Sequence, residues 1–166
     1  TSLVDLENMY ELLEEVPEVQ DAEDAQTFEV KKGLIEFKNV HFGYDPANPV
    51  LNGISFEVQP GTTTAIVGAS GQGKSTLARL LFRFYDPLLG AILIDDQDLS
   101  QVTQASLRRQ IGVVPQDCVL FNETIEYNIR YGRPTATQDQ VYEAAKLAKI
   151  HDFITGLPDG YQTKVG

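Results

Sequence analysis

Residues 68–76 read Gly-Ala-Ser-Gly-Gln-Gly-Lys-Ser-Thr, which fits the pattern G-x-x-x-x-G-K-[ST] of a phosphate-binding loop. In this pattern glycines permit a tight turn, backbone N–H groups surround phosphate oxygens, Lys74 reaches the β- and γ-phosphates, and Ser75 can bind Mg²⁺. The motif requires a strand before it and a helix after it. Residues 62–67 are rich in β-branched side chains and predict a buried strand, and residues 77–82 are typical of a helix. We therefore expect the chain to bind a nucleotide rather than to form a glycine-rich turn without a ligand.

The net charge of −11 is concentrated at the N-terminus. Residues 1–30 hold ten acidic side chains and no Lys or Arg, whereas the remaining residues hold fourteen acids and thirteen bases. The body of the chain is therefore nearly neutral, and we expect no nucleic-acid partner. Cys118 is the only cysteine, which excludes an intramolecular disulfide and favours a packed structural thiol. No apolar run reaches the length of a membrane span.

Hydrophobic spacing predicts the remaining elements. Leucines and a tyrosine at 3- and 4-residue steps indicate an acidic amphipathic helix over about residues 2–15, which Pro17 ends. Thr137 and Gln140 form a capping box at the start of a late helix. Further strands are expected over residues 34–42, 54–58, 91–94 and 111–114, and a short helix over residues 106–110. The order is antiparallel strands first, then α/β.

Two residues outside the loop become informative beside it. Tyr44 lies in Phe-Gly-Tyr-Asp-Pro, after a predicted strand and before the loop. Gln116 ends another predicted strand. Alone, Tyr44 is more typical of a packing or turn residue, and Gln116 carries no signal. Together with residues 68–76, they resemble the nucleotide-binding domain of ATP-binding-cassette (ABC) transporters, and the resemblance covers essentially the whole chain.

The resemblance implies a fold and a set of roles. The fold is α/β: a P-loop NTPase (ABC ATPase) core with an N-terminal antiparallel β subdomain. Tyr44 would stack on adenine, a contact that discriminates weakly among bases. Gln116 would be the Q-loop glutamine, which joins Mg²⁺ and the attacking water. The residues assigned to ATP are Tyr44, Val50, Gly68, Ala69, Ser70, Gly71, Gln72, Gly73, Lys74, Ser75 and Thr76. Ser75 and Gln116 are assigned to Mg²⁺, and Lys74 and Gln116 to catalysis.

Longer phrases narrow the resemblance to subfamily B exporters. The chain resembles half-transporters of the mitochondrial iron–sulfur-export and heavy-metal-tolerance group and their bacterial relatives over residues 81–87, 97–99, 102–108, 113–117, 120–125 and 128–133. Such proteins work as homodimers and carry one membrane domain before one nucleotide-binding domain. The resemblance thus implies a second copy and the chain's own membrane domain, contacted through the Q-loop region, as partners. It places the protein at the cytoplasmic face of a bacterial inner membrane or the matrix face of the mitochondrial inner membrane.

On this resemblance, residues 1–30 are an acidic connector helix and linker from a membrane domain, and residues 31–166 are the N-terminal part of the nucleotide-binding domain. The family's signature sequence, Walker B strand and switch histidine have no match in the chain. Asp95 and Asp96 mimic a Walker B aspartate, but they follow the phosphate loop too closely. Asp96 also departs from the family, which usually has Gly there, whereas Ala69 and Gln72 occupy variable positions. His41 and His151 are better interpreted as structural or surface residues.

We therefore expect residues 1–166 to be a piece of a longer polypeptide that alone does not hydrolyse ATP. The main functional hypothesis is the energy-coupling domain of an exporter. A soluble ABC-type ATPase acting on nucleic acid or ribosomes is a second hypothesis, and the charge distribution argues against it. A module that binds ATP without turnover is a third, and a small-molecule P-loop kinase is the weakest because it explains neither Tyr44 nor Gln116. The transported compound stays open among glutathione conjugates, metal complexes and porphyrins.

Overall fold

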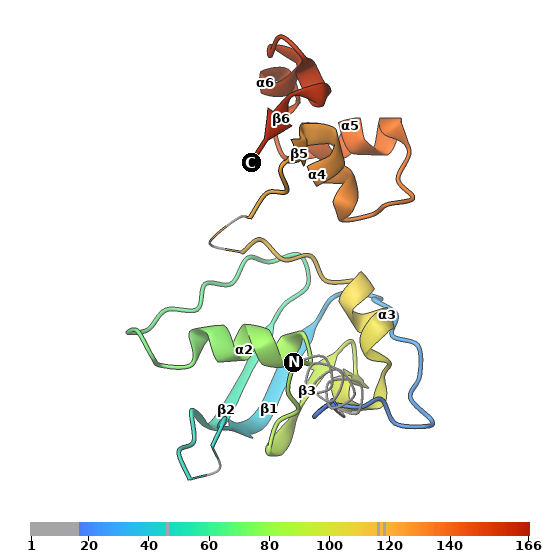
Figure 1. Cartoon of the computed structure of the whole chain (residues 1–166). Helices are drawn as coiled ribbons and strands as arrows, with labels where there is room; N and C mark the ends of the chain where they lie inside the picture. Colours follow the sequence, from blue (N-terminus) through green and yellow to red (C-terminus); the bar gives the residue numbers. More distant parts are fainter. Residues whose placement is uncertain (1–16, 46, 116, 118) are drawn as a thin grey trace, which may run out of the picture. The chain divides into compact units, whose positions relative to one another are not determined.

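The computed structural model describes residues 17–166 apart from 46, 116 and 118 (Figure 1). The predicted helix over residues 2–15 lies outside this part of the chain, as do Gln116 and Cys118. The chain divides into two compact units, Thr1–Gly112 and Val113–Gly166.

The first unit is built on an antiparallel sheet. Its strands are β1 (Ile35–Phe42), β2 (Leu51–Val58), β3 (Leu89–Ile94) and β4 (Gln97–Asp98), in the order β2-β1-β3-β4. The predicted strands over residues 34–42, 54–58 and 91–94 are confirmed, with β2 beginning three residues earlier than expected. Phe37 and Phe56 are direct cross-strand partners, and their rings stack with centroids 4.5 Å apart.

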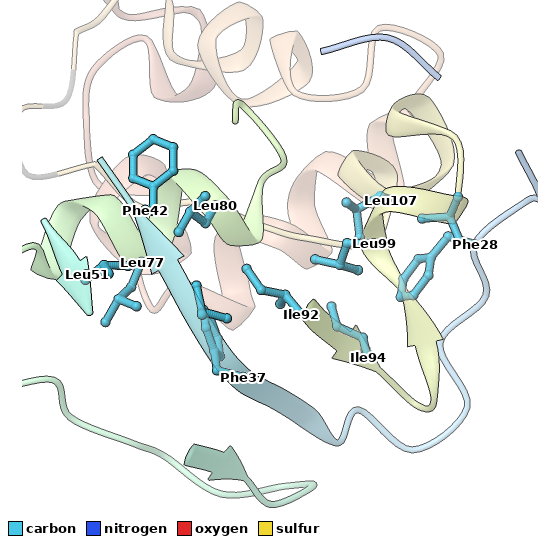
Figure 2. Packing of buried hydrophobic residues seen from close by; sticks show 12 residues of the cluster. Phe28, Phe37, Phe42, Leu51, Leu77, Leu80, Ile92, Ile94, Leu99 and Leu107 are labelled. Carbon is cyan, nitrogen blue, oxygen red and sulfur yellow. The ribbon is translucent and has the colours of Figure 1, made fainter. Parts of the chain in front are cut away.

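Two short helices and a 3₁₀ turn accompany the sheet: α2 (Lys74–Leu81), η1 (Leu99–Gln101) and α3 (Gln104–Arg109). Leu77 and Leu80 of α2 point into the same apolar cluster as Phe42 and Leu51 (Figure 2). Because apolar burial is the main favourable term in folding, this cluster holds the helix that follows the phosphate loop against β1 and β2. The buried members of the cluster are Phe28, Phe37, Val40, Phe42, Leu51, Leu77, Leu80, Ile92, Ile94, Leu99, Val102 and Leu107.

The described part of the acidic segment packs on this unit. Phe28 is 1% exposed, and its backbone N–H donates to Ser106 Oγ at 2.8 Å. Gln26 forms a parallel bridge with Val102. A residue that the sequence analysis placed in a linker therefore contributes to the core, while the domain boundary at residue 30 stays a prediction.

Two predicted strands are absent from the described sheets. Residues 62–67 and 111–114 are assigned to no strand, and most of their side chains are exposed, with Val67 at 93% and Val114 at 98%. The prediction of a buried strand before the phosphate loop is therefore wrong for this structure. A strand exists only through hydrogen bonds to a neighbour, and no described residue pairs with either segment. β-propensity alone cannot replace that partner.

The second unit is mostly helical. It contains β5 (Glu123–Thr124), α4 (Ile125–Tyr131), α5 (Gln138–Leu147), α6 (His151–Thr155), η2 (Gly160–Gln162) and β6 (Lys164–Val165). The predicted capping box is confirmed: Thr137 Oγ1 accepts from the Gln140 N–H, and Gln140 Oε1 accepts from the Thr137 N–H. His151 Nδ1 lies 2.8 Å from the Tyr161 hydroxyl, which agrees with a structural role for this histidine. Within the described residues, no helix is both long and apolar enough to span a bilayer.

Candidate nucleotide-binding site

The glycines of the phosphate loop are required by its geometry. Gly71 and Gly73 have φ of 82° and 80°, a left-handed conformation that side chains rarely adopt. Gly73 is the N-cap of α2. A Cβ atom at Gly73 would lie 2.9 Å from Leu51 Cδ2 and 3.0 Å from Val50 Cγ1. Leu51 at the start of β2 and the preceding Val50 therefore pack against the loop. The assignment of Val50 to ATP stays a prediction.

The Lys74 side chain folds back onto the start of the phosphate loop. Its Nζ donates to the carbonyl oxygens of Gly68 at 2.8 Å and Ala69 at 2.7 Å. The side chain of Gln72 also takes part, because its Oε1 accepts from the Ala69 N–H at 2.9 Å. Gln72 occupies a position that varies in the family, and its side chain here stabilises the backbone of the loop.

The loop offers N–H donors for a phosphate group and a hydroxyl group for Mg²⁺. The first backbone N–H groups of a helix have no acceptor within the helix. No described residue accepts from the amides of Lys74, Ser75 or Thr76, and the Gly73 N-cap offers no side-chain acceptor. Ser75 is exposed, so its hydroxyl is accessible to a hydrated cation. Free amides, a helix N-terminus and one ammonium group form a site that fits a bound phosphate.

Tyr44 lies directly beside the helix that follows the loop. Its hydroxyl is 3.3 Å from Thr76 Oγ1 and accepts from Arg79 Nη1 at 2.8 Å. The ring meets Phe42 and Tyr85 edge-on, at 5.1 and 5.3 Å between centroids, yet the residue is 48% exposed. The Thr76 hydroxyl first, and Arg79 second, lower the pKa of the Tyr44 phenol. An accessible aromatic surface is thus held next to the loop, while its role in stacking on adenine stays a prediction.

Sequence reasoning alone does not single out Arg79, which also contacts Tyr44. Its guanidinium carbon lies 5.7 Å from the centroid of the Tyr44 ring, in addition to the hydrogen bond. Arg79 follows Thr76 by three residues, and positions three apart share one face of a helix. Helical spacing could therefore have placed Arg79 beside Thr76, but nothing local links it to Tyr44, thirty-five residues earlier.

Asp95 has a structural role. Its carboxylate accepts from the backbone N–H groups of residues 31–34 at 2.7–3.0 Å, and it is 8% exposed. These bonds, above all the one from Gly33, hold the pKa of Asp95 well below its usual range. With its oxygens occupied by amides, Asp95 is not free to hold a metal ion, which supports the rejection of a Walker B role. Gln116 lies outside the described residues, so its assignment stays a prediction.

Comparison with known proteins decides the family. Residues 51–165 match the family model described as ABC transporter. The chain belongs to the ABC transporter family. It is 58% identical over 166 residues to ATP-binding cassette sub-family B member 6 of Homo sapiens and 55% identical over 164 residues to the ATM1-type heavy metal exporter of Novosphingobium aromaticivorans. It is also 52% identical over 165 residues to the heavy metal tolerance protein of Schizosaccharomyces pombe.

A solved structure, described as a bacterial Atm1-family ABC exporter with ATP bound, covers 99% of the chain with a TM-score of 0.89 and 55% identity. These findings confirm the ABC ATPase fold and the resemblance to subfamily B half-transporters. The chain covers only a small share of the length of each of these proteins. The chain spans 20% of the human and fission-yeast relatives, 27% of the bacterial relative and 29% of the solved structure.

Proposed function

We propose that this chain is the ATP-binding part of an ABC exporter that couples Mg-ATP binding and hydrolysis to export across a membrane. The observation that carries the proposal is the phosphate loop: Lys74 Nζ lies 2.7–2.8 Å from two loop carbonyls, in front of a helix N-terminus whose amides have no acceptor among the described residues. On binding, the triphosphate would replace those carbonyls as partners of the ammonium. In phosphoryl transfer the protein contributes mainly positioning and charge neutralisation, and Lys74 and the loop amides offer both.

Mg²⁺ would neutralise charge on the β- and γ-phosphates. Ser75, one residue after Lys74, offers its hydroxyl as a ligand on the protein side. We assign the second ligand, and the positioning of the attacking water, to Gln116. ATP hydrolysis is proposed for the complete polypeptide, because the chain has no match to the Walker B glutamate that serves as general base in the family.

Substitution of Lys74 tests the proposal in the complete polypeptide. Lys74→Ala is expected to abolish high-affinity ATP binding or turnover, measured by calorimetry and by phosphate release. Lys146→Ala is the matched control, because Lys146 is exposed in the last turn of α5 and alanine suits a helix. ATP binding and ATPase activity that survive Lys74→Ala would exclude the proposed site. Binding without phosphate release in the unaltered polypeptide would favour an ATP-binding module instead.

We further propose that the complete polypeptide works as a homodimer and that the region after Gln116 contacts its own membrane domain. An exposed aromatic cluster supports the second contact. Phe121, Tyr127 and Tyr131 are 44–57% exposed, and the ring centroids of Phe121 and Tyr131 lie 4.4 Å apart. Exposed aromatic groups that gather on a surface mark interaction sites. Crosslinking from Tyr131 to the membrane domain would test this contact.

The location and cargo follow from relatives alone. We propose a membrane-associated position, at the cytoplasmic face of a bacterial inner membrane or the matrix face of the mitochondrial inner membrane. Two relatives carry heavy metals in their names, and we propose metal compounds as the class of cargo. Export of metal by vesicles that contain the complete polypeptide, with Lys74→Ala as the inactive control, tests the assignment.

A further inference from the structure

Tyr44 and the phosphate loop come from different parts of the chain, yet a nucleotide must meet both. Tyr44 lies between β1 and β2, in an exposed turn, whereas the loop leads into α2. The spacing between base and phosphates in ATP is limited by the ribose that joins them. The ring of Tyr44 must therefore be held at a fixed position relative to α2 before it can contribute to affinity without an ordering cost.

Two residues of α2 provide that connection. Thr76 and Arg79 both contact the Tyr44 hydroxyl, and they lie one helical turn apart on one face. Thr76 is a loop residue already assigned to ATP. Arg79 adds a charge-assisted hydrogen bond at 2.8 Å and a guanidinium 5.7 Å from the ring centroid. Hydrogen bonds from a charged donor are about twice as strong as neutral ones.

Arg79 is poorly placed to contact the phosphates itself. It follows Lys74 by five residues, which corresponds to about 7.5 Å along the helix axis, away from the N-terminus that faces the loop. One of its N–H groups is already used by the phenol oxygen. Its contacts therefore act on Tyr44 and not on the phosphate loop.

We propose that Arg79 is a positioning residue for the nucleobase, fixing the Tyr44 ring to α2 so that the stacking surface and the phosphate loop move as one body. This inference rests on the proposed ATP binding and extends it to a residue that the family motifs do not assign. Loss of Arg79 frees the ring, and ATP must then order it again. Ordering one side chain corresponds to about a two- to tenfold change in Kd.

The test measures the binding of two ligands to five forms of the complete polypeptide, one of which is a control. The ligands are Mg-ATP and inorganic tripolyphosphate, which has phosphates but no base. The forms are the unaltered protein, Arg79→Ala, Tyr44→Ala and the double variant, with Arg109→Ala as a matched control because Arg109 is exposed in α3 and no described residue pairs with it. Arg79 is also exposed and alanine favours helix, so α2 is retained in the variant.

The expected result is specific to the base. Arg79→Ala weakens ATP binding about two- to tenfold, leaves tripolyphosphate binding unchanged, and has no further effect when Tyr44 is already Ala. Equal loss for both ligands, an undiminished effect in the Tyr44→Ala background, or unchanged ATP affinity would each overturn the positioning role. If the unaltered polypeptide binds no ATP, the proposed function fails and the positioning role fails with it.

A second readout needs no nucleotide. Since Arg79 helps to lower the pKa of the Tyr44 phenol, Arg79→Ala should raise that pKa. The phenolate absorbance that disappears with Tyr44→Phe isolates this group from all other tyrosines of the polypeptide, six of which lie in this chain. A Tyr44 titration that does not move in Arg79→Ala would show that the contact is absent in solution.

Discussion

Asp21 and Arg83 form an ion pair at 3.1 Å that ties the acidic N-terminal segment to the residue two places beyond α2. The Arg83 side chain is 3% exposed, and it also donates to the Val102 carbonyl oxygen and to Asp86. The Asp21 carboxylate accepts in addition from the Gln104 N–H at 3.0 Å, at the start of α3. An acidic group from a distant segment therefore caps a helix whose own N-cap, Thr103, makes no side-chain cap bond.

Removal of the Asp21 carboxylate should destabilise the two groups that it binds, the Arg83 guanidinium and the first turn of α3. Asp21→Ala is expected to cost about 1 kcal/mol locally, because it removes a cap and one ion pair of a partly exposed acid. The Gln104 amide should then exchange its hydrogen roughly fivefold faster, measured by mass spectrometry on the complete polypeptide. Asp24→Ala is the control, since Asp24 is exposed and no described residue pairs with its carboxylate. Equal effects of the two substitutions would contradict a specific role for Asp21.

Asp95 predicts a dependence on pH. Its pKa is lowered in the folded protein by four backbone amides, so its contribution to stability is complete above about pH 4, the ordinary pKa, and is lost as the pH falls toward the lower folded value. In Asp95→Asn the amide hydrogens of residues 31–34 should exchange roughly tenfold faster at neutral pH. The loss of folding stability that Asp95 causes as the pH falls should also disappear. Asp96→Asn, in the same turn, is the control and should leave the exchange of these amides unchanged, because no amide of residues 31–34 donates to Asp96. Persistence of the acid-dependent loss in Asp95→Asn would refute this assignment.

Local chemistry explains which predictions from sequence succeeded. The loop glycines, the capping box at Thr137 and the three confirmed strands depend on residues close together in the chain or on simple alternation. The segment over residues 62–67 failed because its strand character depends on a hydrogen-bonded neighbour. Asp21 and Arg79 carried no local signal either, because their partners are 62 and 35 residues away.

The end of α5 offers a stabilising substitution. Lys149 has φ of 59°, and the Ile150 N–H donates to the Ala145 oxygen while the Lys149 N–H donates to the Lys146 oxygen. This is the Schellman pattern, which favours glycine at the position of Lys149. Lys149→Gly should stabilise the helix end by about 0.5–1 kcal/mol, seen as slower exchange of the Ile150 amide. Lys146→Gly, three residues earlier inside the helix, should instead destabilise it by about 1 kcal/mol. If both substitutions stabilised the helix end, or both destabilised it, the left-handed cap at Lys149 would be contradicted.

A comparison of alanine substitutions at Gly71 and Gly73 distinguishes the effect of backbone strain from the effect of packing in the phosphate loop. Both have φ near 80°, so alanine at either position carries a similar left-handed strain of about 1–2 kcal/mol. A Cβ at Gly71 meets nothing within 4 Å, whereas at Gly73 it meets Leu51 and Val50 at 2.9–3.0 Å. Overpacking of this kind costs about 1–3 kcal/mol, and the loop must shift away from β2 to relieve it. Gly73→Ala should therefore weaken Mg-ATP binding to the complete polypeptide by roughly 5- to 150-fold more than Gly71→Ala, measured by calorimetry. Equal losses would mean that strain alone governs the loop and that its support by β2 does not contribute to nucleotide affinity.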